Sequence, residues 1–322
     1  MTHKVILDTD PGIDDAMALF TALAHPDLDL IGVTTTFGNV AVQQATRNAL
    51  TLLEMAQASH IPVAQGGATP WILPTPPFPD FVHGADGFGN LHLPPPNTQA
   101  LQQPAPAFIV EQILKYPHEI NLVAIGPLDN LAAALQLNPD IAHLVKQVVI
   151  MGGVLDHDGN VSPVAEANIF CDPHAAEKVM AAPWPVVMVG LDVTHQVVLN
   201  QALFERIRDA NPRVGSFMYD AVQFYMRFYG SIRGIKGCYG HDVSAVAYVI
   251  DPTLFQTIEG SICVATEGVA LGQTIIDRHG LSSYALKHWN HRPKQKACVG
   301  VDAKRLLTLF ENSMTSDFWH NT

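Results

Sequence analysis

The chain has 322 residues, of which 48% are hydrophobic and 15% are charged, a composition typical of globular proteins that excludes extensive disorder. A formal net charge of −12, without any run of Lys or Arg, argues against nucleic-acid binding or anionic-membrane binding as the main role. The longest apolar runs, such as 185–191, have the length of a strand and are far too short to span a membrane.

The N-terminus leads directly into the first predicted strand and has no signal-peptide pattern. The cysteines lie far apart and form no Cys-x-x-Cys pair: Cys171, Cys238, Cys263 and Cys298. Free thiols are typical of a reducing compartment, so we expect a cytoplasmic protein.

Short β-branched runs alternate with helical patterns along the chain. The predicted strands are 4–8, 30–36, 121–125, 147–151 and 186–190, and the predicted helices are 14–24, 40–58, 105–116, 128–137, 173–181 and 200–210. This alternation predicts an α/β fold with a single open, mostly parallel sheet and helices on both faces. We find no repeat or linker, and therefore expect one domain over residues 1–322. Functional groups should gather at the carboxyl ends of the strands.

The stretch 66–103 does not fit the alternation. It is rich in proline, with "PWILPTPPFPD" and "LHLPPPN", and is too long for an ordinary connection. Loops of this length in compact domains usually form lids or binding loops, so we expect a mobile flap here.

Four aspartates lie within eight positions of the segment "DTDPGIDD": Asp8, Asp10, Asp14 and Asp15. Pro11 and Gly12 would make the turn after the first strand, and Asp14 and Asp15 would begin a helix. Acidic residues at a helix N-terminus are favoured by its dipole, so one or two of them could be simple caps. Four together are better explained by a hard cation such as Ca²⁺ or Mg²⁺, which oxygen ligands select.

Two further groups of polar residues follow. His241 and Asp242 stand at the start of another apolar helix, where each could be only a cap or a satisfied loop residue. Asn160, Glu166 and Asn168 lie in a predicted loop after "VVIMGG". Amide and carboxylate groups so spaced suit the hydroxyl groups of a sugar, although Asn and Asp also bond to their own loops.

Together the motifs "DTDPGIDDAMAL", "TTFGN", "IGPLDNLA", "MGG", "SPVAEANIFCDP" and "HDVSAVAYVIDP", in this order between residues 8 and 252, resemble the inosine-uridine-preferring nucleoside hydrolase family. The resemblance implies a Rossmann-like nucleoside hydrolase fold and hydrolysis of the N-glycosidic bond of a small-molecule ribonucleoside. It also implies a homo-oligomer, either a dimer or a tetramer.

By this resemblance, Ca²⁺ would be held by Asp10, Asp15, Asp242 and the backbone carbonyl of Ile125, a position where threonine is common. Asp10 would also act as general base toward a water molecule. Asp8 would support the other aspartates from behind.

The resemblance also assigns substrate contacts. Asp14, Asn39 and Asn168 match positions that contact the 2′ and 3′ hydroxyls, and Asn160 and Glu166 match those that bind the 5′ hydroxyl. His241 is the candidate acid that protonates the leaving base, because an imidazole titrates near neutrality. The remaining matches concern the base: Tyr229 and Arg233 fit a proton relay, and His83 lies near the base on the flap.

The preferred base stays open, although His241 favours the broader or pyrimidine-accepting branch over purine-specific relatives that use tryptophan stacking. Two other classes of protein share part of this pattern. A haloacid-dehalogenase-like phosphatase also begins with Asp-x-Asp after a strand, but it needs a later lysine and acidic pair that we do not find. A non-catalytic nucleoside- or Ca²⁺-binding protein on the same fold would be expected to lose Asp10 or His241, and both are present.

Overall fold

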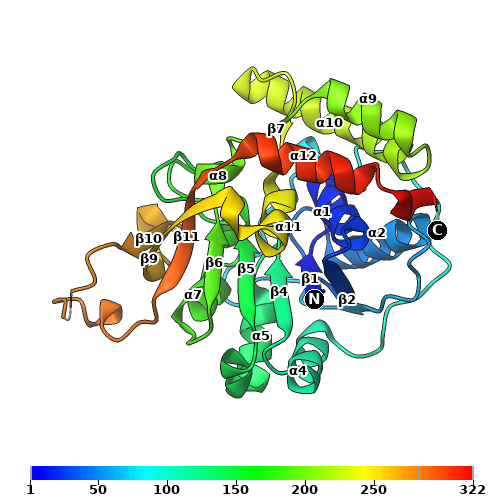
Figure 1. Ribbon diagram of the computed structural model, residues 1–322. Coiled ribbons are helices and arrows are strands. Elements are labelled where there is room, and N and C mark those ends of the chain that lie inside the picture. The colour runs from blue at the N-terminus through cyan, green and yellow to red at the C-terminus, as the bar shows by residue number, and fades with distance from the viewer. Residues whose placement is uncertain (1, 282, 321–322) are drawn as a thin grey trace.

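The computed structural model describes residues 2–281 and 283–320. A nine-stranded open sheet of order β10-β9-β11-β6-β5-β4-β1-β2-β3 forms its centre (Figure 1). From β3 to β11 neighbouring strands run parallel, and β9 and β10 add an antiparallel edge. The strands are β1 (His3–Thr9), β2 (Leu28–Thr35), β3 (Val63–Gln65), β4 (Ile120–Ala124), β5 (Gln147–Met151), β6 (Val186–Val189), β9 (Phe255–Val264), β10 (Thr274–Asp277) and β11 (Gln295–Val301), with β7 (Val198–Leu199) and β8 (Cys238–Tyr239) paired separately.

Helices cover both faces of the sheet (Figure 1). One face carries α1 (Ile13–Ala24), α2 (Val42–Met55), α9 (Gln201–Ala210), α10 (Val214–Arg233), α11 (His241–Ile250) and α12 (Ala303–Met314). The other carries α4 (Ala105–Lys115), α5 (Asp129–Leu137) and α7 (Pro173–Ala181). Short helices are α3 (Asp80–His83), α6 (Ala167–Cys171) and α8 (Leu191–Thr194), and 3₁₀ turns are η1 (Pro139–His143), η2 (Pro252–Leu254), η3 (Gly268–Ala270), η4 (Lys287–Trp289) and η5 (Asp317–His320).

Alternate side chains of the central strands enter different cores. On β1, Val5 and Leu7 pack into the core beneath α1, whereas Ile6 packs into the core beneath α4 and α5. On β4, Val123 packs into the core beneath α1 and Leu122 packs into the core beneath α4 and α5. A strand buried on both faces needs apolar residues at nearly every position, which is why these segments read as continuous apolar runs.

Every predicted strand and helix is present, with ends that differ by a few residues, and the expected fold class is confirmed. Sequence reasoning missed the helices α10 and α12, the C-terminal strands, and the short elements β3, β7, β8, α3, α6 and α8. The missed helix α10 is the one that matters for function, because its tyrosines enter the site described below.

The order β3-β2-β1-β4-β5-β6 places a topological switch point between β1 and β4. Connections from β1 lead toward one edge of the sheet and those from β4 toward the other, so the loops after these two strands separate and leave a crevice. The segment from Asp8 to Asp10 and the turn at Ile125 both lie at this point.

The proline-rich stretch 66–103 contains only the short helix α3 and otherwise follows an irregular path. Backbone bonds hold its first residues: Gly67 N–H donates to Asn130 Oδ1 (3.2 Å) and Trp71 N–H donates to Asp172 Oδ2 (2.8 Å). At its far end Leu101 forms a β-bridge with Ala64 of β3. Its middle is held as well: Asn48 Nδ2 donates to the Asp86 carbonyl (2.9 Å), and Ile13 N–H donates to His83 Nδ1 (3.2 Å). The stretch therefore covers the crevice from a fixed position, and the expected mobility of the flap is not supported.

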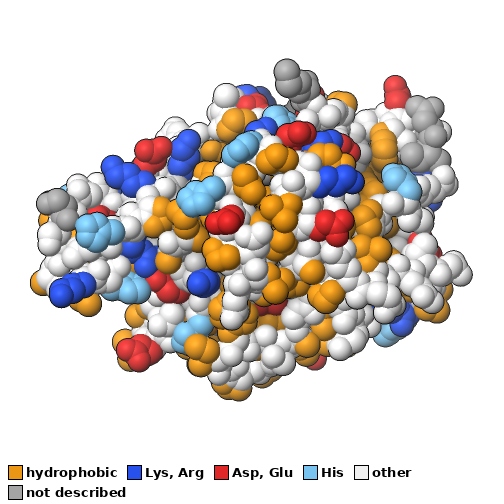
Figure 2. Space-filling view, turned by 90° about the horizontal axis from the view of Figure 1, so that it is seen from below, with side chains coloured by type: hydrophobic (Ala, Val, Ile, Leu, Met, Phe, Trp, Pro, Cys, Tyr) orange, Lys and Arg blue, Asp and Glu red, His pale blue; other side chains and the backbone are white. Residues whose placement is uncertain are grey.

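Residues 278–281 and 283–294, between β10 and β11, lie away from the sheet at the left edge of Figure 1. The sequence 278–294 is basic. It holds four Lys or Arg residues and no acidic residue, in a chain of net charge −12. Figure 2 shows Lys, Arg and His side chains at this end, and charges of both signs among apolar side chains over the rest of that face.

No helix in the described residues is both long and apolar enough to cross a membrane.

Gly32 tests the packing of α4 on the sheet. It lies at a register shift between β1 and β2, where a Cβ atom would come within 2.4 Å of the Phe108 ring. Because Phe108 is itself buried, the ring cannot move away, and we expect Gly32→Ala to lower the free energy of unfolding by about 1–3 kcal/mol. Urea unfolding measures this difference.

Gly230, on helix α10, provides the matched control, because a Cβ added there would meet only the Ile235 carbonyl oxygen, at 3.7 Å. The control variant is Gly230→Ala. It should leave stability unchanged or raise it by up to about 1 kcal/mol. Equal effects of the two substitutions would contradict the packing described for Gly32.

Candidate active site

A cavity of about 300 Å³ opens at the carboxyl ends of the central strands. Except for Asp15, every residue predicted for catalysis, substrate or metal binding lines it: Asp10, Asp14, Asn39, His83, Ile125, Asn160, Glu166, Asn168, Tyr229, Arg233, His241 and Asp242. These residues come from loops and helices after different strands and from the flap. The fold therefore brings the predicted set together at the switch point.

Asp15 lies just beneath the cavity and organises the turn between β1 and α1. Its carboxylate accepts hydrogen bonds from the backbone N–H groups of Gly12 (2.9 Å) and Asp10 (3.3 Å) and from Asn39 Nδ2 (3.0 Å). The capping role considered for Asp14 or Asp15 is therefore filled by Asp15. The Thr9 hydroxyl also donates to Oδ1 (2.5 Å), so each oxygen of Asp15 accepts two hydrogen bonds, and a cation would have to take the place of one of these donors.

Asp10 is enclosed by two glycines. A Cβ on Gly38 would come within 2.0 Å of Asp10 Oδ2, and one on Gly126 within 2.5 Å of Oδ1. Oδ2 accepts the Asn39 N–H at 2.6 Å, while Oδ1 is buried and has no hydrogen-bond partner among the described residues. The glycines of "TFGN" and "IGP" are thus needed for the carboxylate to fit at the strand ends.

Asp14 faces the flap and α10. Its Oδ2 accepts the Tyr225 hydroxyl (2.9 Å), and its buried Oδ1 has no hydrogen-bond partner in the described chain. His83 Nδ1 lies 3.9 Å from Oδ1 but accepts the Ile13 N–H (3.2 Å). Burial lowers the pKa of His83 to about 3, so its ring is neutral at pH 7 and forms no ion pair with Asp14.

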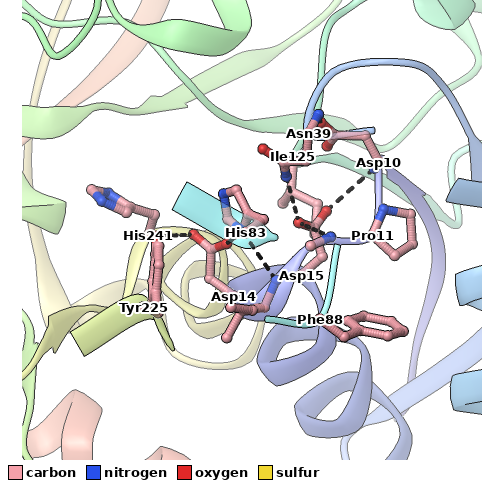
Figure 3. Close-up of polar contacts among 12 residues, drawn as sticks. Asp10, Pro11, Asp14, Asp15, Asn39, His83, Phe88, Ile125, Tyr225 and His241 are labelled. Carbon is pink, nitrogen blue, oxygen red and sulfur yellow. Dashed lines mark hydrogen bonds and ion pairs between the residues drawn. The ribbon is translucent and has the colours of Figure 1, made fainter. Parts of the chain in front are cut away.

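Carboxylate oxygens of Asp14, Asp15 and Asp242 lie within 4.8 Å of one another, and all three residues are buried. Figure 3 shows the aspartates of the β1–α1 turn between Asn39 and Ile125 on one side and His83, Tyr225 and His241 on the other. An all-oxygen cluster of this size can hold a hard metal ion. Of the predicted ligands, the cluster contains Asp15 and Asp242 and leaves out Asp10, while Asp14, which was not predicted as a ligand, belongs to it; Asp10 and Ile125 line the same cavity.

The electrostatics of the cluster call for a positive charge. Burial raises the pKa of Asp10 well above its usual value, and repulsion from Asp15 raises it further. Burial, with repulsion from Asp14, does the same for the pKa of Asp242, and the pKa of Asp14 rises to about 7. Each carboxylate disfavours ionisation of the next, so a cation among them would be strongly attracted. The residues present therefore fit a metal ion.

Asp8 points away from this cluster, toward the core on the other face of the sheet. Its Oδ1 accepts hydrogen bonds from the Thr34 hydroxyl and Asn130 Nδ2 (2.8 Å), and burial raises its pKa to about 7. Asn130 in turn holds Gly67 at the start of the flap. Asp8 therefore supports the crevice through Asn130 rather than by contact with the other aspartates.

Asn168 lies in the short helix α6, whereas the sequence indicated a loop. The helix forms because Glu166 caps it: its carboxylate accepts the N–H groups of Asn168 (2.9 Å) and Ile169 (3.2 Å). Burial raises the pKa of Glu166 to about 6. Asn168 Nδ2 donates to the carbonyls of Ile125 (3.0 Å) and Met151 (3.1 Å), which joins the ends of β4 and β5.

Asn160 stands on the exposed loop before α6. Its Oδ1 accepts the Ala167 N–H (2.9 Å), which fixes the loop to the helix. Glu166 and Asn160 therefore both make the local bonds expected of a capped loop, and both also line the cavity.

His241 occupies the opposite wall of the cavity. Its Nε2 lies 2.8 Å from the Tyr229 hydroxyl and its Nδ1 lies 2.8 Å from Thr194 Oγ1. Burial lowers the pKa of His241 well below 6.5, and the nearby His195 and His83 lower it further. Burial therefore works against the expectation that this imidazole titrates near neutrality and favours its neutral form, while the acid role of His241 stays a prediction.

Arg233 lies at the exposed C-terminal end of α10, and no hydrogen bond joins it to Tyr229 or His241 in the described structure. Sequence reasoning missed Tyr225, Thr194 and His195, which contact or adjoin the predicted site. Tyr225 was detectable in principle, because a spacing of four residues places Tyr225 and Tyr229 on one helix face.

The sequence and fold match known proteins. The sequence model described as inosine-uridine preferring nucleoside hydrolase matches residues 5–308. The probable uridine nucleosidase 2 of Arabidopsis thaliana is 41% identical over 307 residues, which cover 95% of each chain. The inosine-uridine preferring nucleoside hydrolase of Leishmania major is 39% identical and covers 86% of this chain and 88% of its own.

Two solved structures agree with this. A plant nucleoside hydrolase has a TM-score of 0.95 at 37% identity, covering 98% of this chain and 100% of its own. A purine-preferring ribonucleoside hydrolase from Gardnerella vaginalis has a TM-score of 0.92 at 34% identity, covering 99% and 100%. With the family motifs gathered around one acidic cavity, these matches lead to one conclusion: the chain belongs to the inosine-uridine preferring nucleoside hydrolase family.

Proposed function

We propose that the protein is a calcium-dependent ribonucleoside hydrolase, which cleaves the N-glycosidic bond of purine or pyrimidine ribonucleosides to ribose and free base in nucleoside salvage. The observation that carries the proposal is the polarity of the cavity. Buried carboxylates line one wall, and the His241–Tyr229 pair lines the other. A ribose with a developing positive charge suits the first wall, and a base that must gain a proton suits the second.

Asp10, Asp15, Asp242 and the carbonyl of Ile125 would hold Ca²⁺, with Asp14 beside them. The unpartnered oxygens of Asp10 and Asp14 and the mutual repulsion of the cluster support this assignment. The cation would supply electrophilic activation of the attacking water and a positive charge that offsets the carboxylates.

Asp10 is the proposed general base. Its free Oδ1 is buried at the cavity floor, between the turns after β2 and β4, where it can accept a proton from a water molecule in the cavity. The Asn39 N–H holds Oδ2, so the carboxylate keeps one orientation and presents Oδ1 to the water.

The ribose hydroxyls would bind between the strand ends. Asp14, Asn39 and Asn168 are proposed for the 2′ and 3′ hydroxyls, and Asn160 and Glu166 for the 5′ hydroxyl. The cavity position of all five supports this, as does the rigid capping of α6 by Glu166. His83 on the flap would contact the base side from its fixed position over Ile13.

His241 and Tyr229 would deliver the proton to the leaving base. Burial raises the pKa of Tyr229 well above 10, so its hydroxyl holds a proton that a departing base anion can take up. His241 must itself gain a proton from solvent before it can return one to Tyr229, because a neutral imidazole that gave up its N–H would become imidazolate. Arg233 would act from the cavity mouth, where an exposed guanidinium can reach a bound base.

The alternatives fit less well. No lysine lines the cavity in the described chain, and a haloacid-dehalogenase-like phosphatase needs one. A non-catalytic nucleoside-binding protein would have no use for the His241–Tyr229 pair, and the assays below separate it from an enzyme.

We also propose a cytoplasmic location and a homo-oligomeric assembly. The cysteines are free, which supports a reducing cytoplasm. Exposed apolar side chains near β10 support a homo-oligomer, a dimer or a tetramer, whose mass sedimentation would measure; they are Val269, Ile275, Leu281 and Leu286.

The first test is reducing-sugar release from inosine, uridine and cytidine. We expect release from at least one of them, loss of activity in EDTA, and recovery when excess Ca²⁺ is added, because the carboxylates alone repel one another. No release from any nucleoside would contradict the hydrolase function, and full activity in EDTA would contradict the metal assignment.

Asp10→Asn should lower kcat by about 10²–10⁴-fold, because an amide cannot accept the proton of the attacking water. Substrate binding measured by calorimetry should change far less. Asp209→Asn, an exposed position on α9, is the control and should keep wild-type kcat. Near-normal turnover in Asp10→Asn would show that another group is the base.

His241→Ala should lower kcat/KM for inosine by about 10²-fold or more, since a poor leaving base needs the proton. With p-nitrophenyl riboside, whose leaving group needs none, the loss should be much smaller. Steady-state kinetics on both substrates gives the comparison, and equal losses would argue against an acid role.

A further inference from the structure

The short helix α8 follows β6 within the sequence "GLDVTHQ" and touches two separate parts of the cavity. Its Asp192 contacts the loop that carries Asn160, its Thr194 contacts His241, and His195, directly after it, lines the cavity. Neither Asp192 nor Thr194 lines the cavity itself. The helix is therefore placed behind the site, between its ribose side and its base side.

Asp192 holds the beginning of the Asn160 loop. Its Oδ2 accepts the Leu155 N–H (2.8 Å) and its Oδ1 accepts the Asp156 N–H (2.7 Å). The backbone of α8 adds a third bond, from Leu191 N–H to the Gly153 carbonyl (2.9 Å). A carboxylate that receives two backbone N–H groups fixes both the position and the direction of the chain that follows.

Thr194 holds the ring of His241. The Thr194 side chain is fully buried, and its hydroxyl lies 2.8 Å from Nδ1, while Tyr229 lies at Nε2 on the other side of the ring. A hydroxyl can donate to or accept from an imidazole nitrogen, so this contact suits either form of the neutral ring. Without it, the buried nitrogen would lose its partner and the ring would lose one of its two polar restraints.

We propose that α8 is a shared positioning element of the active site: Asp192 sets the loop that receives the ribose 5′ side, and Thr194 orients His241 toward the base. The inference rests on the proposed function, because it assigns these residues to the two halves of a nucleoside. It predicts that a substitution of Asp192 and a substitution of Thr194 impair different parts of the same reaction.

Thr194→Val removes the hydroxyl and keeps the shape. We expect kcat/KM for inosine to fall at least about tenfold, part of the contribution of a general acid, with a change under about threefold for p-nitrophenyl riboside. Thr194→Ser restores the hydroxyl and should recover most of the activity on inosine. Thr194→Ala provides the same comparison if the valine variant does not fold.

Asp192→Asn keeps the size of the side chain but leaves one oxygen for two N–H groups. We expect a higher KM for inosine and a smaller preference for inosine over 5′-deoxyinosine. The ratio of inosine to p-nitrophenyl riboside activity should stay at the wild-type value. Asp158→Asn, an exposed residue of the same loop, is the matched control and should leave the KM for inosine and both ratios unchanged.

The outcomes are distinguishable. If the wild-type protein cleaves no nucleoside, the proposed function fails, and the inference falls with it. If the wild type is active but the Thr194 and Asp192 variants lose all three substrates in proportion, α8 is only structural and the inference is overturned. Separate losses, with rescue by Thr194→Ser and melting temperatures near wild type, would support it.

Discussion

The repulsion among buried carboxylates at the end of β1 is the constraint on which the rest of the site depends. Asp10, Asp14 and Asp15 come from one turn, and Asp242 comes from the start of α11. Bringing them together in a buried place raises the free energy of each ionised group. The surrounding structure reduces this cost through the Asn39 and Gly12 N–H groups, and a cation would offset the remainder.

The same constraint explains the local sequence. Glycines at 38 and 126 are needed because any side chain there would overlap Asp10, and a Cβ on Gly12 would come within 2.6 Å of His83 Nδ1. The parallel sheet contributes by ending β1 and β4 at a switch point, where their loops diverge and leave room for a ligand. The switch point of the sheet, the glycine turns and the buried carboxylates therefore all lie at one crevice. In it, a sugar can lie against the acidic wall and a base against the aromatic wall.

Much of this could be predicted from the sequence, because local patterns encode it. The apolar runs identified the central strands, and the Pro-Gly turn between acidic residues identified the start of α1. The different roles of neighbouring residues in the site could not be predicted in the same way. Asp14 and Asp15 are adjacent on a helix, and only the entry angle of α1 decides that Asp15 caps the turn while Asp14 faces Tyr225. Helix α10 was missed because its aromatic residues have only middling helix propensity and its N-terminus has no capping side chain. The contacts of Thr194 and Asp192 join segments far apart in the chain, which no local pattern reveals.

The central claim is that the carboxylate cluster exists to hold one cation. Isothermal titration of Ca²⁺ into protein freed of metal with EDTA tests it most directly, because it requires neither substrate nor turnover. The account predicts one site per chain that Asp15→Asn weakens strongly, whereas Asp209→Asn, far from the cluster, binds like the wild type. Absence of binding, or binding that Asp15→Asn leaves unchanged, would contradict it.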